Sequence, residues 1–134
     1  MIIVDSSALA KLLVSADQSA ALRQALLQQS SLGDEFAIST MAVTELRRLT
    51  IRLAVTPDRI VPIVSRFHII RLSESVLQIA ARLPARHLGT LDAIHLATAL
   101  AVEASTVITY HRRQAEAAQA EGIATLSPGG LDPV

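Results

Sequence analysis

Short apolar runs alternate with longer amphipathic stretches along most of the chain. The short runs are rich in β-branched residues, which is typical of buried strands. The longer stretches repeat apolar residues every three or four positions, as Ala8, Leu9, Leu12 and Leu13 do, and this spacing predicts helices. Strands are expected at 2–4, 36–38, 69–72, 107–108 and 124–126, and helices at 7–15, 19–30, 40–54, from 57, 73–83, 91–103 and 112–121.

Residue types at several boundaries support these elements. Ser39 or Thr40 is expected to cap the third helix and Thr90 the helix from 91, because hydroxyl side chains accept bonds from free helical amides. Pro57 stands at a first helical turn, where proline is tolerated. The segment 127–134 holds two prolines and two glycines, and this composition predicts a loose tail.

The alternation of strands and helices predicts an α/β fold. We expect one domain over residues 1–134, since this length suits a single hydrophobic core. Its central sheet should be mostly parallel, with four to five strands and helices on both faces. Sites in such folds lie beyond the carboxyl ends of the strands, which directs attention to Asp5, 39–45 and 109–111.

Composition narrows the classes of protein that remain. The chain has no cysteine, so it has no disulfide, zinc thiolate or cysteine nucleophile, and it suits a reducing cytoplasm. No apolar run approaches the ~18 residues of a membrane span, and no basic segment precedes the first strand as in a signal peptide. Twelve basic and twelve acidic residues cancel, which argues against tight non-specific binding of nucleic acid.

Three carboxylates stand where the predicted topology can bring them together. Asp5 follows the first strand, Glu45 lies in the helix after the second, and Asp92 lies in the first turn of a later helix. Clustered carboxylates raise each other's pKa unless a cation lies between them. A site of oxygen ligands alone favours Mg²⁺ or Mn²⁺, which can activate water and stabilise charge on a phosphate.

Each of these residues also has a plain structural explanation. Asp5 can cap the first helix, Glu45 can pair with Arg48 one turn on, and Asp92 is favoured near a helix N-terminus by the helix dipole. His95 lies one turn from Asp92 on the same face, and we expect it to be a packed or supporting histidine rather than a metal ligand. These alternatives stay open at the level of single residues.

Four sequence strings carry a stronger signal together than any does alone. They are IIVDSSALAKLL at 2–13, TMAVTELRR at 40–48, LDAIHLATALA at 91–101 and VITYHRRQAEAAQAEGIATLSPG at 107–129. In order and spacing they resemble the successive motifs of VapC-type PIN domains. The resemblance implies a PIN-like α/β/α sandwich spanning the whole chain, an acidic cluster that binds Mg²⁺ or Mn²⁺, and endonucleolytic cleavage of RNA by a metal-activated water.

The resemblance also assigns roles by position. The motif acids are Asp5, Glu45 and Asp92, which are expected to be both catalytic and metal-binding. Polar residues that support the metal shell are expected at Ser6, Ser7, Thr109 and His111. Arg112 and Arg113 open a helix beside the presumed site, and helix N-termini attract anions, so they are candidates for binding RNA phosphates.

His111 departs from the pattern, because such proteins usually carry a fourth acid there. It could still bind the metal as neutral imidazole and shift the preference toward Mn²⁺. It could orient water or stabilise a phosphate when protonated. It could also mark a weakened nuclease, and this keeps open an alternative function as a catalytically silent binding or regulatory module. A phosphatase with Asp5 as nucleophile is a further alternative, weakened because residue 7 is serine where a second aspartate is expected.

The resemblance finally implies partners. It predicts the toxin of a type II toxin–antitoxin system, inhibited by a cognate VapB-like antitoxin, acting on RNA in the cytoplasm and pairing as a homodimer. Leucines of the first two helices exceed what one sheet face requires and are expected to line a groove for the antitoxin, with core packing as the alternative for about half of them. They are Leu9, Leu12, Leu13, Leu22, Leu26 and Leu27.

Overall fold

A five-stranded sheet in which every pair of neighbours is parallel forms the centre of the molecule. The computed structural model describes residues 1–133. The strands are β1 (Ile2–Val4), β2 (Phe36–Ser39), β3 (His68–Ile70), β4 (Thr106–Ile108) and β5 (Ala124–Leu126). Their order across the sheet is β3-β2-β1-β4-β5. The predicted α/β class and the parallel sheet of four to five strands are confirmed.

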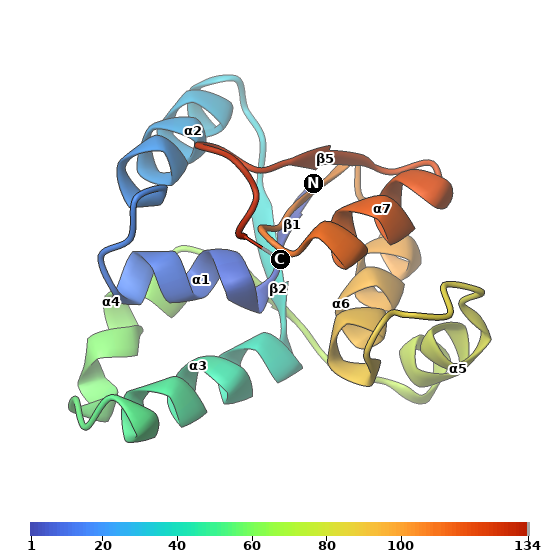
Figure 1. The fold of residues 1–134 in the computed structure, drawn as a ribbon, viewed down its shortest axis with the longest axis horizontal. Helices are drawn as coiled ribbons and strands as arrows, with labels where there is room; N and C mark the ends of the chain where they lie inside the picture. Colours follow the sequence, from blue (N-terminus) through green and yellow to red (C-terminus); the bar gives the residue numbers. More distant parts are fainter. Residues whose placement is uncertain (134) are drawn as a thin grey trace.

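Helices cover both faces of this sheet (Figure 1). One layer contains α1 (Ser6–Leu13), α2 (Ser19–Ser31), α3 (Thr40–Arg52), the 3₁₀ turn η1 (Pro57–Ile60) and α4 (Val61–Val64). The other contains α5 (Glu74–Arg82), α6 (Thr90–Ala101) and α7 (Arg112–Ala120). The arrangement is the expected α/β/α sandwich. None of the helices in the described part of the chain is long and apolar enough to cross a membrane.

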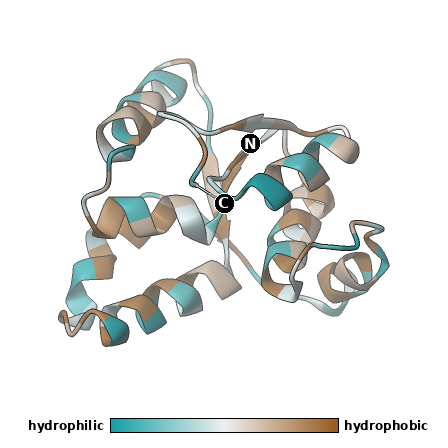
Figure 2. Cartoon of the chain, viewed as in Figure 1, coloured by the Kyte–Doolittle hydropathy of each residue, from teal (hydrophilic) through white to brown (hydrophobic). Residues whose placement is uncertain are grey.

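The strands are apolar on both faces because each face meets a helical layer. Ile2 and Val4 belong to the core under α1, α2 and α3, whereas Ile3 between them belongs to the core under α6 and α7. Side chains alternate across a strand, so β1 divides its three residues between two cores. Figure 2 shows the central strands as hydrophobic and the outer surfaces of several helices as hydrophilic. This two-sided burial explains why the strands appear in the sequence as uninterrupted apolar runs.

The chain changes direction across the sheet at β1. It first runs outward through β2 to β3, then returns to place β4 on the other side of β1. Val4 pairs with Ile108, and the Asp5 amide donates to the Ile108 carbonyl at 3.1 Å. Residues that follow β1 and β4 therefore lie side by side at a topological switch point, where α/β folds form their sites.

Three predicted boundaries need correction. The strand expected at 69–72 is His68–Ile70, an edge strand whose Ile69 is exposed, so the apolar pattern there does not report burial. Gly89, rather than Thr90, is the N-cap of α6, and it makes no side-chain cap bond. The helix expected from Pro57 is the single turn η1 followed by the single turn α4. Ser39 is confirmed as the cap of α3, because its hydroxyl accepts from the Ala42 amide at 3.1 Å.

The leucines of α1 and α2 mostly serve the core. Leu9, Leu13 and Leu22 are buried, so core packing, the alternative expected for about half of the six leucines, holds for these three. Leu12 and Leu26 are partly buried and pack against the same core. Leu27 alone of the six is mostly exposed, at 73%.

The segment after β5 is fastened to the body of the protein, so the prediction of a loose tail over 127–134 is wrong for 127–133; residue 134 lies outside the described residues. Asp132 accepts hydrogen bonds from Lys11 Nζ at 2.7 Å and from Gln18 Nε2 at 3.0 Å. The Asp132 amide donates to the Tyr110 carbonyl at 2.9 Å. We call these contacts the C-terminal clasp. Proline and glycine indicate irregular backbone, and here that backbone is held by an ion pair.

Tyr110 also connects the segment after β5 to the body of the protein. Its hydroxyl donates to the Pro128 carbonyl at 2.9 Å, and Lys11 Nζ lies 4.7 Å from the centre of its ring. Burial, followed by the negative charges of Asp132 and Asp5, raises the pKa of Tyr110 to about 12. The tyrosine therefore stays neutral and acts as a hydrogen-bond donor across the physiological range.

The C-terminal clasp should contribute to stability. Replacement Asp132→Asn removes the charge that faces Lys11, whose side chain is only 11% exposed. We expect the free energy of unfolding to fall by about 1–3 kcal/mol, the usual worth of a hydrogen bond to a charged group. Urea denaturation followed by circular dichroism measures it. Asp17→Asn, at an exposed aspartate, is the control and should leave stability unchanged; equal values for both variants would show that the clasp is not stabilising.

Candidate metal centre

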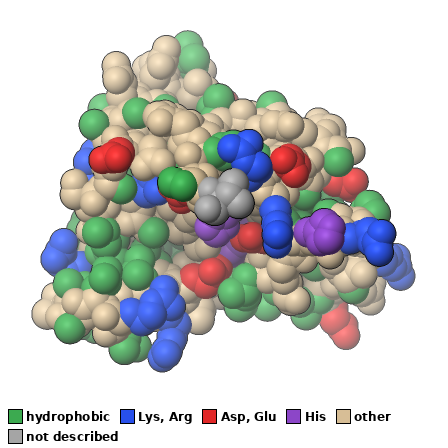
Figure 3. All heavy atoms as spheres, in the orientation of Figure 1, with side chains coloured by type: hydrophobic (Ala, Val, Ile, Leu, Met, Phe, Trp, Pro, Cys, Tyr) green, Lys and Arg blue, Asp and Glu red, His purple; other side chains and the backbone are tan. Residues whose placement is uncertain are grey.

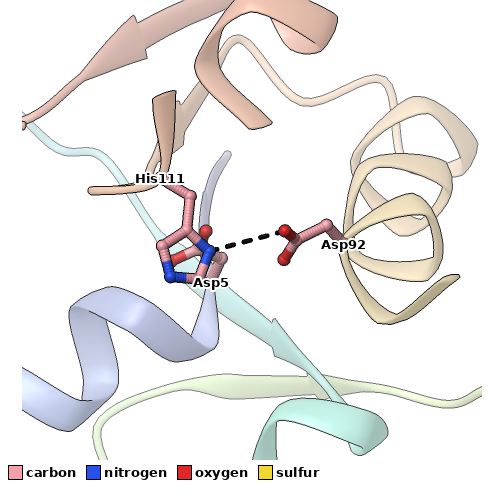
Figure 4. Close-up of side chains that lie close together, drawn as sticks. All are labelled: Asp5, Asp92 and His111. Carbon is pink, nitrogen blue, oxygen red and sulfur yellow. Dashed lines mark ion pairs between the residues drawn. The ribbon is translucent and has the colours of Figure 1, made fainter. Parts of the chain in front are cut away.

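Three side chains from separate segments meet at the carboxyl edge of the sheet (Figure 4). Asp5 directly follows β1, His111 follows β4 and precedes α7, and Asp92 lies in the first turn of α6. Each offers one ligand atom, and these atoms lie within 4.8 Å of one another. We call this group the metal cluster.

Asp5 is the buried member, with no exposed surface. Its Oδ1 accepts from the Ser7 hydroxyl at 2.6 Å and from the Ala8 amide at 3.2 Å, so the capping role predicted for it is also confirmed. Burial raises the pKa of the Asp5 carboxyl, and this effect outweighs the Ser7 and Thr109 hydroxyls, which favour the ionised form.

The second Asp5 oxygen is the clearest sign that the cluster suits a cation. Oδ2 is buried and has no hydrogen-bond partner among the described residues. A buried carboxylate oxygen without a partner carries a desolvation cost that an ordinary fold avoids. A cation bound to Oδ2 would remove that cost, and the carboxylates and imidazole beside it are accepted ligands of divalent metals.

His111 occupies the open side of the cluster. Its Nδ1 lies 3.4 Å from Asp92 Oδ2, and the two side chains are 48% and 23% exposed. The neighbouring Asp92 carboxylate raises the pKa of His111, while partial burial opposes the shift. The imidazole can therefore bind a cation once it has lost its proton. The geometry fits the first of the three roles considered for this residue.

Glu45 lies outside the metal cluster. Its Oε1 lies 2.5 Å from His95 Nε2, and its Oε2 accepts from the Ser6 hydroxyl at 3.1 Å. No ion pair joins it to Arg48 among the described residues, so its position in α3 is not explained by that pair. Ser6, which directly follows Asp5 in the chain, and His95 therefore hold the two oxygens of the Glu45 carboxylate.

The remaining predicted supporting residues are in place. Ser7 accepts from the Tyr110 amide at 2.9 Å while donating to Asp5, so it joins the ends of β1 and β4. The Thr109 hydroxyl accepts from the His111 amide at 3.1 Å and fixes the entry to α7. Both residues therefore set the backbone that presents the cluster.

The sequence reasoning missed two contributors. Gln114 is fully buried and donates from Nε2 to the Asp92 carbonyl at 3.0 Å, which ties the first turn of α6 to α7. Gln114 is a polar residue among the alanines that α7 buries, and the sequence could have revealed its role through this contrast. Ser39 is predicted as a cap within the strand-end segment 39–45, but its hydroxyl also contacts His95 Nδ1 at 2.8 Å. Ser39 and His95 are 56 positions apart, so no local sequence pattern predicts this contact.

Arg112 and Arg113 are exposed in the first turn of α7, next to His111. The Arg113 guanidinium donates to the His87 carbonyl at 3.4 Å, in the connection between α5 and α6. Figure 3 shows basic side chains beside acidic ones over the α6–α7 half of this face. Positive charge therefore lies close to the acidic cluster although the whole chain is neutral.

Comparison with known proteins agrees with this geometry. The PIN domain family matches residues 2–120. The chain is similar to ribonuclease VapC47 of Mycobacterium tuberculosis, with 35% identity over 98% of this chain and 99% of that protein. It is similar to ribonuclease VapC46 of the same organism, with 33% identity over 95% of this chain and 97% of that protein.

Solved structures share the fold. The chain resembles one from a toxin–antitoxin complex of Klebsiella pneumoniae, with a TM-score of 0.70, 24% identity and coverage of 100% of this chain and 98% of that one. It also resembles VapC20 of Mycobacterium tuberculosis, described as a toxin that cleaves the sarcin–ricin loop, with a TM-score of 0.73, 14% identity and coverage of 96% and 100%. At these identities the likeness concerns the fold alone.

The shifted pKa values predict how metal binding depends on pH. The folded, metal-free state holds protons on Asp5 and His111 more tightly than the unfolded chain, whose values are 3.8 and 6.5. Both shifts therefore make the free energy of unfolding fall as pH rises through the folded-state pKa values. A divalent cation must displace these protons, so its stabilising effect should grow with pH.

Thermal unfolding with and without Mn²⁺, at about pH 6 and about pH 8, tests this expectation on either side of the ordinary histidine pKa. The increase in Tm caused by Mn²⁺ should be larger at the higher pH. Asp92→Asn, which removes one charge from the cluster, should reduce the increase at both values. An equal increase at both pH values in the unaltered protein would contradict proton displacement from His111.

Proposed function

The chain belongs to the PIN-domain family, and from that premise we propose that it is a VapC-type toxin, an endoribonuclease that requires a divalent metal. The observation that carries the proposal is the unpartnered, buried oxygen of Asp5 beside Asp92 and His111. The similarity to two ribonucleases over nearly the full chain supports RNA as the substrate. The proposal treats residues 1–134 as one PIN domain.

We propose Mg²⁺ or Mn²⁺ as the metal, with Asp5, Asp92 and His111 holding it and Glu45 completing the site from α3. The nitrogen ligand shifts the preference toward Mn²⁺, since imidazole suits that ion better than it suits Mg²⁺. The bound metal supplies a Lewis acid that balances charge on a phosphate and makes water a better nucleophile.

The protein's own residues bind and orient the substrate in this proposal. Arg112 and Arg113 are exposed at the start of α7, next to His111, where they can bind backbone phosphates of the RNA. Ser7 joins the segments after β1 and β4 through the Tyr110 amide, and Thr109 fixes the His111 backbone, so that Asp5 and His111 are presented together. Glu45, which Ser6 and His95 hold outside the cluster, is the acid proposed to accept a proton.

A VapB-like antitoxin is the proposed partner, supported by VapC relatives and by neighbours solved as toxin–antitoxin complexes. An open apolar hollow between α1 and α3 includes Ala10, Val14, Leu49 and Leu53 and reaches His111. A peptide segment of the antitoxin lying there would cover the approach to the metal cluster. We further propose that the protein is a cytoplasmic homodimer.

Cleavage of RNA by the purified, antitoxin-free protein tests the proposal. Total cellular RNA incubated with Mn²⁺ or Mg²⁺ should be cut at defined positions, which mapping of the new ends would reveal. Asp92→Asn should reduce the rate by at least about a hundredfold, because the cluster loses a ligand charge. Asp58→Asn, at an exposed aspartate in η1, should cleave at the unaltered rate.

The same experiment addresses the alternative of a silent binding module, for which His111 in place of an acid is the favouring observation. Absence of metal-dependent cuts from folded protein would reject the nuclease and leave that alternative. Cuts that persist in Asp92→Asn would point instead to a contaminating nuclease.

His111→Asp restores the acid usual at this position and adds a negative charge beside Asp92, whose Oδ2 lies 3.4 Å from His111 Nδ1. We expect it to bind Mg²⁺ more tightly, by about tenfold, because an oxygen ligand suits this ion better than imidazole does. Isothermal titration calorimetry with Mg²⁺ measures the change. Variant His87→Asp, at an exposed histidine outside the cluster, controls for the general effect of an added negative charge, and equal gains in both would remove any special role of position 111.

A further inference from the structure

A chain of hydrogen bonds runs from the end of β2 to the start of α1 through the interior. The Ser39 hydroxyl contacts His95 Nδ1 at 2.8 Å, and His95 Nε2 contacts Glu45 Oε1 at 2.5 Å. Glu45 Oε2 then accepts from the Ser6 hydroxyl at 3.1 Å. The four residues come from β2, α6, α3 and α1, so the chain joins both helical layers at the edge of the sheet that carries the metal cluster.

His95 is the centre of this chain and is almost completely buried, with 1% of its surface exposed. Both ring nitrogens have partners on opposite sides, so the ring cannot rotate without breaking a bond. A neutral ring with its proton on Nε2 satisfies every group: Nε2 donates to Glu45, and Ser39 donates to Nδ1 while accepting from the Ala42 amide. The contacts of His95 thus define one orientation.

The hydrogen bonds of this chain also restrict the conformation of the Glu45 side chain. Its side chain is 27% exposed, and a glutamate on a helix surface otherwise samples many rotamers in water. Here one oxygen is fixed by His95 and the other by Ser6. His95 lies one turn along α6 from Asp92, so the helix that presents a cluster acid also fixes the orientation of Glu45.

We propose that His95 is a positioning residue that aims the Glu45 carboxylate at the metal centre, with Ser39 fixing the ring from behind. The proposal deepens the proposed nuclease function and rests on it for the role of Glu45. His95 is not a metal ligand in this arrangement, because both nitrogens are engaged by protein groups and the ring is not part of the metal cluster.

A purely structural role makes a different prediction. Removing one partner of a buried hydrogen-bonded pair lowers stability, so His95→Leu is expected to lower the Tm whether the histidine is structural or positioning. Second-sphere partners of metal-site residues, by contrast, typically affect metal affinity or activity by about 10–100-fold. Metal affinity and kcat, rather than stability, therefore distinguish a positioning role from a purely structural one.

The test uses the full chain and the variants His95→Leu, His95→Gln, Glu45→Gln and the double variant His95→Leu with Glu45→Gln. Mn²⁺ binding is measured by calorimetry, and kcat and KM are measured with an RNA substrate identified by end mapping. His95→Leu should weaken Mn²⁺ binding or lower kcat by about tenfold with KM unchanged. His95→Gln should recover most of the loss, because its amide can still donate to Glu45.

The double variant is decisive. If His95 acts only through Glu45, His95→Leu should add nothing to the effect of Glu45→Gln. Additive losses, or full Mn²⁺ affinity and kcat in His95→Leu, would overturn the proposal. If His95→Leu does not fold, Ser39→Ala, which removes the hydroxyl that fixes the ring, carries the same comparison, and unaltered Mn²⁺ affinity and kcat in it would overturn the proposal equally.

A matched control exists on the surface. His68 Nε2 lies 3.7 Å from Glu35 Oε2, and both side chains are more than half exposed, so His68→Leu removes a histidine–glutamate pair remote from the centre and should change neither readout. The two proposals can fail separately. If the wild-type protein binds Mn²⁺ but cuts no RNA, the proposed nuclease function is refuted. Weaker Mn²⁺ binding by His95→Leu would still support the positioning role of His95.

Discussion

The burial of one carboxylate at the end of the central strand is the constraint on which the site depends. Asp5 has no exposed surface, and one of its oxygens has no partner among the described residues. A fold tolerates a buried carboxylate only where other interactions compensate for its lost hydration. The neighbouring elements do this in part through Ser7 and the N-terminus of α1, and they leave the other oxygen without a partner in a residue that groups with Asp92 and His111.

The sheet topology makes this arrangement possible. The strand order changes direction at β1, so the segments after β1 and β4 leave the sheet side by side and in register. Hydrogen bonds then join the layers at this edge: Ser7 links Asp5 to Tyr110, and Gln114 links α7 to the Asp92 carbonyl. The acids come from distant parts of the chain, and tertiary contacts rather than local sequence bring them together.

The sequence predicts the parts of the fold that local patterns control. Apolar runs located the central strands because both their faces are buried, and the same rule failed at β3, where an edge strand exposes Ile69. The cap at Ser39 followed from residue type, whereas Gly89 caps α6 without any side-chain bond that a pattern could reveal.

Within the site, spacing and family resemblance placed Asp5, Asp92 and His111 near one another, and the structure brings them together. The same reasoning predicts Glu45 as a direct metal ligand. Glu45 lies outside the cluster, so its role as a ligand stays a prediction. The contact between Ser39 and His95 spans 56 positions and that between Lys11 and Asp132 spans 121, so no short window of sequence contains either pair. Such contacts depend on how the layers pack.

The C-terminal clasp has a practical consequence for handling the protein. Asp132 is tied to Lys11 and Tyr110, beside the hollow that reaches His111, whereas Met1 precedes β1 at the opposite edge of the sheet. A polyhistidine purification tag fused after the clasp would bring extra imidazoles to the metal cluster and compete for the same cation. A tag placed before Met1, with a cleavable linker, keeps those ligands a full strand length from the centre.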